Sequence, residues 1–145
     1  MKRYEIRCTE EQTKKALELG APITEFDSEY KLEERMSACG DIPAFGSFDD
    51  YLNKDEYPDI CVLEIDESRY AYALPTTEQM KGWIEDTGND IRFEVTTGIA
   101  HTWHYYIHIG YNKDYLNLFN SGYSSREEAT LAAIDAALEY LANKK

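Results

Sequence analysis

All three histidines of the chain lie within eight residues, in the segment His-Thr-Trp-His-Tyr-Tyr-Ile-His that begins at His101. His104 and His108 are four residues apart, a spacing that would pair two metal ligands on one face of a helix. The alternating aromatic context instead predicts a strand, on which their side chains share a face but stand roughly 13 Å apart, too far for one zinc ion. We therefore expect no metal site and no cofactor, and interpret the histidines as part of a polar row on a strand.

The nucleophilic side chains form no recognised catalytic pattern. Cys8, Cys39 and Cys61 are odd in number and widely spaced, and without a Cys-x-x-Cys pair they indicate neither a disulfide framework nor a zinc knuckle. The segment Gly122–Arg126 lacks the final glycine of a nucleophile elbow, and the chain contains no P-loop and no G-x-G-x-x-G motif. We predict buried, reduced thiols and a protein that is not an enzyme.

A long helix near the C-terminus, expected over 124–143, is the most clearly marked element. Ser124 or Ser125 can cap its first turn, and Glu127 or Glu128 can complete a capping box. The helix has a wide uncharged face, which is typical of a helix that lies flat on a sheet. That face consists of Leu131, Ile134, Leu138 and Leu141 with Ala129, Ala133, Ala136 and Ala137.

The residues before this helix predict one more helix and three strands. Thr76 and Gln79 fit a capping box, and Gly88 marks the end of the helix that they begin. Alternating apolar residues predict strands over 91–95, 103–109 and 116–118. Residues 75–145 are therefore expected to form an α-β-β-β-α unit with its helices packed on one face of an antiparallel sheet.

The N-terminal half shows weaker periodicity. Alternation from Arg3 to Cys8 predicts a strand, and Thr9 begins a predicted helix that ends near Gly20. The other elements expected here are a helix over 28–38 and a hairpin over 60–74. The chain is thus predicted to be α+β, with an acidic β-α region and a hairpin before the C-terminal unit. Its two regions, 1–67 and 68–145, form either separate domains or one continuous domain.

The predicted order of the C-terminal elements, together with several residues, resembles the double-stranded RNA-binding domain. Residues 98–101 read Gly-Ile-Ala-His, similar to the family's G-P-x-H loop, whose histidine lies at the RNA minor groove; His101 would be its counterpart. Residues 125–130 fall where the family carries its K-K-x-A-K signature. Arg126 keeps one positive charge, but Glu127 reverses a second, and the family's lysines are what neutralise phosphates. The resemblance implies the family's fold, and we expect no binding of duplex nucleic acid.

A second resemblance covers only the C-terminal half. A helix opening Pro-Thr-x-x-Gln-Met-x-x-Trp, alternating aromatic strands and a closing Ala-rich helix resemble an uncharacterised family of small α+β proteins of Bacteroides-type bacteria, their phages and mobile elements. The residues that carry this resemblance are Pro75, Thr76, Gln79, Met80, Trp83, Tyr123, Glu128, Ala129, Ile134 and Leu138. It implies an origin in a phage or mobile element, and it brings no assigned activity and no catalytic residues.

The charge of the chain is concentrated in one segment. Of the net charge of −13, residues 24–67 carry −11, from 14 acidic and 3 basic residues. Such a charge opposes association with nucleic acid or an anionic membrane. No apolar run is long enough to span a bilayer, and the N-terminus has charges where a signal peptide needs an apolar core. We expect a cytoplasmic protein.

The acidic segment also holds the candidate binding residues. Acidic side chains stand beside aromatic rings there, a composition typical of an interaction patch. The candidates are Asp49, Asp50, Tyr51, Asp55, Glu56 and Tyr57, together with His101. We predict a non-enzymatic protein-interaction or regulatory module with a basic protein partner. The open alternatives are an RNA-binding protein, an acidic mimic of nucleic acid, an enzyme of unrecognised type, and an acidic segment that serves only solubility.

Overall fold

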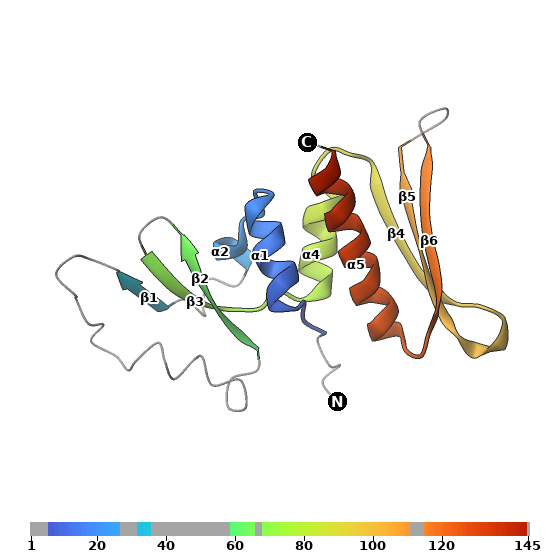
Figure 1. The fold of residues 1–145 in the computed structure, drawn as a ribbon, viewed down its shortest axis with the longest axis horizontal. Helices are drawn as coiled ribbons and strands as arrows, with labels where there is room; N and C mark the ends of the chain where they lie inside the picture. Colours follow the sequence, from blue (N-terminus) through green and yellow to red (C-terminus); the bar gives the residue numbers. More distant parts are fainter. Residues whose placement is uncertain (1–5, 27–31, 36–58, 66–67, 111–114, 145) are drawn as a thin grey trace. The chain divides into compact units, whose positions relative to one another are not determined.

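The chain combines helices with antiparallel sheets, which confirms the predicted α+β class (Figure 1). The computed structural model describes residues 6–26, 32–35, 59–65, 68–110 and 115–144. It divides into a C-terminal unit, Met1–Cys8 with Thr76–Lys145, and an N-terminal unit, Thr9–Pro75. The boundary considered in the sequence analysis, between residues 67 and 68, lies between two strands of the N-terminal unit that pair with each other.

The first helix, α1 (Glu10–Glu18), begins at the predicted capping box. The Thr9 hydroxyl accepts a hydrogen bond from the Gln12 N–H at 3.1 Å, and the Gln12 side chain accepts one from the Thr9 N–H at 3.0 Å. Two backbone donors are thereby satisfied. The helix ends before Gly20, whose φ of +98° is a conformation that side chains disfavour. A short helix, α2 (Ile23–Phe26), follows.

The N-terminal sheet has β3 (Ser68–Ala73) at its centre. This strand pairs antiparallel with β2 (Ile60–Ile65), which confirms the predicted hairpin, and on its other side with β1 (Leu32–Arg35). The helix predicted over 28–38 is therefore wrong for residues 32–35. It rested on the i, i+4 spacing of Leu32 and Met36, a weak signal, whereas pairing with β3 satisfies those backbone groups of β1 that face β3. The buried side chains of this sheet include Cys61, Leu63, Ala71, Tyr72 and Ala73.

The C-terminal unit has the predicted order of helix, three strands and helix. Its elements are α4 (Thr77–Glu85), β4 (Ile91–Thr97), the 3-10 turn η1 (Ile99–His101), β5 (Trp103–Ile109), β6 (Leu116–Tyr123) and α5 (Arg126–Asn143). The sheet is antiparallel with the order β4-β5-β6, so β5 is central. β6 is longer than predicted because its pairing with β5 continues to Tyr123, past an irregularity at Trp103 and His104.

Helix α4 also begins at its predicted capping box. The Thr76 hydroxyl accepts from the Gln79 N–H at 3.1 Å, and the Gln79 side chain accepts from the Thr76 N–H at 2.9 Å. Met80 and Ile84 of this helix are fully buried. Gly88, with a φ of +84°, follows the end of the helix and leads the chain toward β4.

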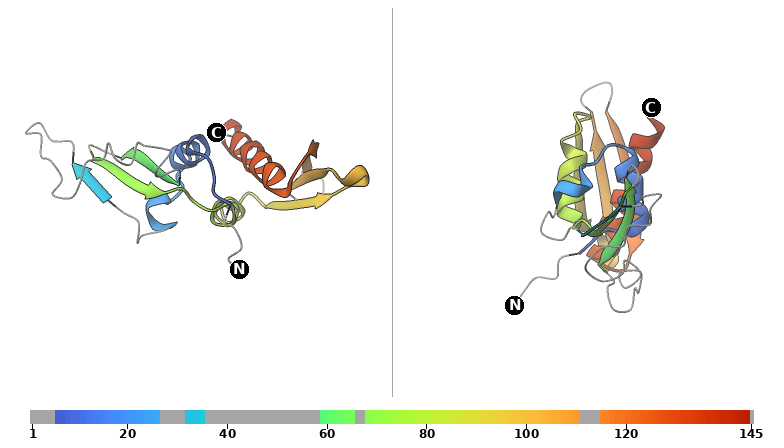
Figure 2. Two further views of the ribbon diagram at one scale, coloured as in Figure 1. Left: turned by 90° about the horizontal axis from the view of Figure 1, so that it is seen from below. Right: turned by 90° about the vertical axis from the view of Figure 1, so that its left-hand side faces the viewer.

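Helix α5 lies across the sheet, as predicted, and contacts all three strands as well as α4 (Figures 1 and 2). Its Ser125 hydroxyl caps the first turn by accepting from the Glu128 N–H at 3.2 Å. The Glu128 carboxylate reaches back to Ser124, whose N–H and hydroxyl donate to it at 3.2 and 2.8 Å. The buried face consists of Ala129, Thr130, Ala133, Ile134, Ala137, Leu138 and Leu141. The small alanines on this face let the helix approach the sheet closely.

The first described residues of the C-terminal unit pair with the start of α4. Arg7 forms an isolated antiparallel bridge with Thr76, and the Thr77 N–H donates to the Ile6 carbonyl at 2.8 Å. In the described residues, the strand predicted from Arg3 to Cys8 is limited to this bridge. Cys8 is buried as predicted, as is Cys61 of the N-terminal unit, whereas Cys39 lies outside the described residues. No helix in the described ranges is long and apolar enough to cross a membrane.

Candidate functional site

The two faces of the C-terminal sheet differ in what covers them. Residues of β5 alternate between the faces, as in any strand. One row is buried under α5 and consists of Tyr105, Ile107 and Ile109. The other row points to the opposite face and consists of the half-buried His104, Tyr106 and His108. Both helices of the described part of this unit lie on the first side of the sheet, so the second face carries no helix (Figure 1).

Aromatic rings gather on this second face. Phe119 of β6 pairs with Tyr106 of β5, and their ring centroids are 4.7 Å apart. His104 lies 5.7 Å from the Phe119 ring, and the His108 ring is nearly parallel to that of Tyr106 at 6.0 Å. Phe119 nevertheless stays 51% exposed and Tyr115 45% exposed. These five residues are called the aromatic face below.

His108 connects the aromatic face to a carboxylate. Its Nε2 is 3.2 Å from the Glu94 Oε2, and its Nδ1 is 2.5 Å from the Tyr115 hydroxyl oxygen. An imidazole with its proton on Nε2 satisfies both contacts, donating to Glu94 and accepting from Tyr115. This chain of groups fixes the orientation of the His108 ring. It stands on an open surface, and Glu94 is 56% exposed, whereas catalysis needs a concave site that holds a substrate.

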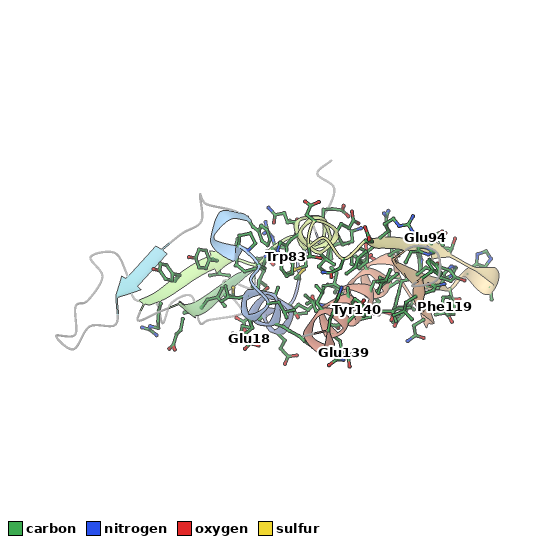
Figure 3. All side chains as sticks on the ribbon, turned by 90° about the horizontal axis from the view of Figure 1, so that it is seen from above. Glu18, Trp83, Glu94, Phe119, Glu139 and Tyr140 are labelled. Atoms are coloured by element: carbon green, nitrogen blue, oxygen red, sulfur yellow. The ribbon has the colours of Figure 1, made fainter. Side chains whose placement is uncertain are left out.

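A cavity of about 330 Å³ lies beside β6, between that strand and α5. In Figure 3, Glu139 and Tyr140 project from α5, and Phe119 lies on the strand side. The lining residues are Tyr105, Leu118, Phe119, Ala136, Glu139, Tyr140 and Asn143. The cavity carries one carboxylate and two phenols, and it lies away from the contact between His108 and Glu94.

Two titratable groups of this unit are held in their protonated forms. Burial raises the pKa of the Tyr105 hydroxyl, and Tyr123 and Asp135 raise it further. Burial, with a smaller contribution from Asp135, raises the pKa of the Cys8 thiol from 9.0 to about 12. The Cys8 thiol also donates to the Thr76 carbonyl oxygen at 3.9 Å. Since the thiolate is the reactive form, Cys8 is a packing residue and not a nucleophile.

The loop before β5 carries His101, the candidate binding residue that the resemblance to the RNA-binding domain suggested. Its Gly98 N–H donates to the Thr102 carbonyl at 2.9 Å, and both Ala100 and His101 have positive φ angles, of 70° and 60°. His101 is exposed. A Cβ atom at Gly98 would lie 3.0 Å from the His104 Nδ1, so this glycine lets the loop pass close to the aromatic face.

The same end of the sheet holds the start of α5. Strand register places Thr97, Trp103 and Tyr123 side by side, and α5 begins three residues after Tyr123. This start carries one cation, Arg126, and two carboxylates, all exposed. With two carboxylates beside a single cation, the charges at this helix start do not favour phosphate.

The structure places only part of the predicted site. His101 lies on the exposed loop, and His104 and His108 lie on one strand, as the strand interpretation requires. In the described ranges, no group of three or more His, Cys, Asp or Glu side chains could hold a metal ion. The acidic and aromatic candidates lie outside the described residues; they are Asp49, Asp50, Tyr51, Asp55, Glu56 and Tyr57.

Sequence reasoning missed Phe119, Tyr115 and Glu94 as members of a surface. The available signal was the alternation of β5, which places His104 and Tyr106 on the face opposite the core. The charge-free composition of residues 115–125 was a second signal. Comparisons with protein-family models, with curated proteins and with solved structures returned no match for the chain.

Proposed function

We propose that the chain is a non-enzymatic protein-interaction module whose aromatic face binds a basic protein. The observation that carries the proposal is the exposure of Phe119 and Tyr115 beside Tyr106, on the sheet face opposite the described helices α4 and α5. Grouped aromatic rings are enriched in the centres of protein interfaces, where they supply large contact area at a low entropic cost. An isolated exposed ring is ordinary, but a cluster of rings held in mutual contact supports a binding surface.

The charge distribution supports a basic partner. The N-terminal unit contains 6 basic and 17 acidic residues, a net charge of −11, whereas the C-terminal unit contains 9 and 11, a net charge of −2. The negative charge of the chain therefore attracts a positively charged protein, over a distance limited by the screening effect of salt. On arrival, arginine side chains of the partner can stack on the rings of Tyr106 and Phe119 through cation–π contacts.

Single-stranded nucleic acid is the competing ligand, because open sheets with aromatic rings also stack bases. Such sheets combine their rings with a positively charged groove that follows the phosphates. Here the described strand residues of the aromatic side contribute Arg92 and Glu94, whose charges cancel. The protein partner is therefore favoured, and single-stranded RNA is included in the test.

The test compares two variants of the full chain in capture experiments. Tyr106→Ser removes a central ring of the aromatic face, and Leu116→Ser is the control, because Leu116 pairs with Ile109 and is 44% exposed on the other side of the sheet. Basic proteins captured by the wild type should be lost with Tyr106→Ser and kept with Leu116→Ser. Circular dichroism melting checks that both variants are folded.

Two results would count against this function. One is equal capture by both variants, which would show that binding does not depend on the aromatic face. The other is binding of a labelled 12-nucleotide U-rich RNA at micromolar concentration, lost with Tyr106→Ser, which would establish the face as a base-stacking surface.

The acidic segment, residues 24–67, is proposed to steer the basic partner toward the chain. Changing four of its acidic residues to the corresponding amides should slow capture of the basic partner, because it lowers the charge that steers the encounter. The residues to change are Asp49, Asp50, Asp55 and Glu56. Capture kinetics that do not change with these substitutions, at low or physiological salt, would exclude a steering role.

A further inference from the structure

Among the described residues, β6 is an edge strand of its sheet, and apart from the irregularity opposite Trp103 and His104 it lacks the charges and prolines that usually protect sheet edges. Such edges are commonly blocked by lysines, prolines or a covering element. Residues 115–125 read Tyr-Leu-Asn-Leu-Phe-Asn-Ser-Gly-Tyr-Ser-Ser, with no charge and no proline. Among the described residues, the exposed large hydrophobic side chains are Tyr115, Leu116 and Phe119, all on or next to this strand.

The direction of the backbone groups on β6 follows from the strand pairing. The Gly110 N–H donates to the Asp90 carbonyl at 3.1 Å, so the even-numbered residues of β5 direct their backbone groups toward β4. Tyr106 is one of these, and its partner on β6, Phe119, is then in a non-hydrogen-bonded pair. The N–H and C=O of Phe119 therefore point away from β5, along the free edge.

The residues two positions before and after Phe119 on β6 also direct their backbone groups away from β5. Asn117 and Ser121 stand two residues from Phe119 and direct their backbone groups outward as well. In agreement with this, the Ser121 N–H donates to the side-chain oxygen of Asn120 at 2.9 Å and not to a strand. The edge thus offers three residues in the spacing of an antiparallel ladder, and the Ser121 N–H would exchange its bond to the Asn120 side chain for one to the added strand.

We propose that β6 pairs with β6 of a second copy of this chain, antiparallel about a twofold axis at Phe119. In that register Phe119 faces Phe119 of the other copy, and Asn117 faces Ser121. Outward donors meet outward acceptors, because an antiparallel pair of identical edges is self-complementary. The two three-stranded sheets would then form one six-stranded sheet.

A second copy fits this edge because the strand carries no charge. Pairing a strand with itself brings each side chain close to copies of its neighbours, so any charge would meet a like charge. Residues 115–125 are free of that penalty.

The register predicts a charge-swap experiment on the full chain. Asn117 and Ser121 are exposed. In the proposed dimer, Asn117 of each copy faces Ser121 of the other copy, so the same pair occurs on both sides of the axis. In N117K/S121K, lysine would face lysine at both positions, whereas in N117K/S121E each lysine would face a glutamate. Sedimentation equilibrium at 0.15 M salt should show a wild-type dimer, a dimer Kd about tenfold higher for N117K/S121K, and a Kd at or below that of the wild type for N117K/S121E.

Three results would overturn the proposal. These are a monomeric wild type at several hundred micromolar, equal dimer Kd values for the two double variants, and a wild-type dimer that weakens when salt is raised to 0.5 M. The third result would contradict the proposal because two copies of charge −13 repel each other, so salt screening should strengthen their association. Capture of a basic partner should instead weaken with salt, and it depends on Tyr106 of the central strand, so the two proposals fail separately.

Discussion

The buried thiol of Cys8 should make the stability of the fold depend on pH above 9. Its pKa rises from 9.0 to about 12 in the folded protein, mainly through burial and secondarily through Asp135. Below pH 9 the thiol is protonated in the folded and the unfolded chain, so it has no effect. Between pH 9 and 12 the unfolded chain binds fewer protons, and the free energy of unfolding falls by about 1.4 kcal/mol per pH unit, roughly 4 kcal/mol over the whole range.

The variant Cys8→Ala isolates this contribution. At pH 7 it should be less stable than the wild type by about 1 kcal/mol, because it loses packing and the contact with Thr76. The wild type should lose this advantage near pH 10 and become the less stable protein above it. Tyr105, whose raised pKa acts in the same direction, is present in both proteins and cancels in the difference.

Urea unfolding of both proteins at pH 7, 9, 10 and 10.5 measures the difference directly. A stability gap that stays constant over this range would refute the reasoning, since it would mean that the Cys8 thiol ionises equally easily in the folded and unfolded chain. The titration of the other cysteines does not affect the comparison, because both proteins contain them.

Three other substitutions and one ligand provide further tests. Ile134→Ala should lower the free energy of unfolding by roughly 2–5 kcal/mol in urea titrations, because its side chain is fully buried between α5 and the sheet. Gly98→Ala should displace the His104 ring, since the new Cβ would lie 3.0 Å from Nδ1; unchanged His104 chemical shifts in NMR spectra would contradict this. Thr76→Ala should cost about 1 kcal/mol in thermal unfolding through loss of the capping box, and no loss would contradict the cap. A duplex RNA of about 20 base pairs should not bind at physiological salt in a gel shift; sub-micromolar binding lost on His101→Ala would restore the family's function.

Local chemistry explains why the helices were predictable. A capping box needs only residues three apart, so Thr76 and Gln79 identify the start of α4 without reference to the rest of the chain. The same holds for Thr9 and Gln12. The failure at residues 32–35 has the opposite cause, because four residues of β1 become a strand only when β3 stands beside them.

The candidate site shows the same division between local and long-range information. Alternation along β5 assigns His104, Tyr106 and His108 to one face, and the sequence alone indicates that they share a side. It does not indicate that Phe119 lies against Tyr106 or that Glu94 contacts His108. Those neighbours depend on the register between strands.

The sequence by itself therefore determined the class of the fold, the order of helices and strands from residue 75 onward, and the capped starts of three helices, because each follows from spacing within one segment. Tertiary structure decided which face α5 covers, which rings remain exposed and which strand becomes the open edge. These features depend on strand pairs such as Tyr106 with Phe119, whose partners are joined only after β5 and β6 fold against each other. The sequence of a single strand does not specify which residues of the next strand it pairs with. The aromatic face and the edge position of β6 could therefore be identified only from the folded chain.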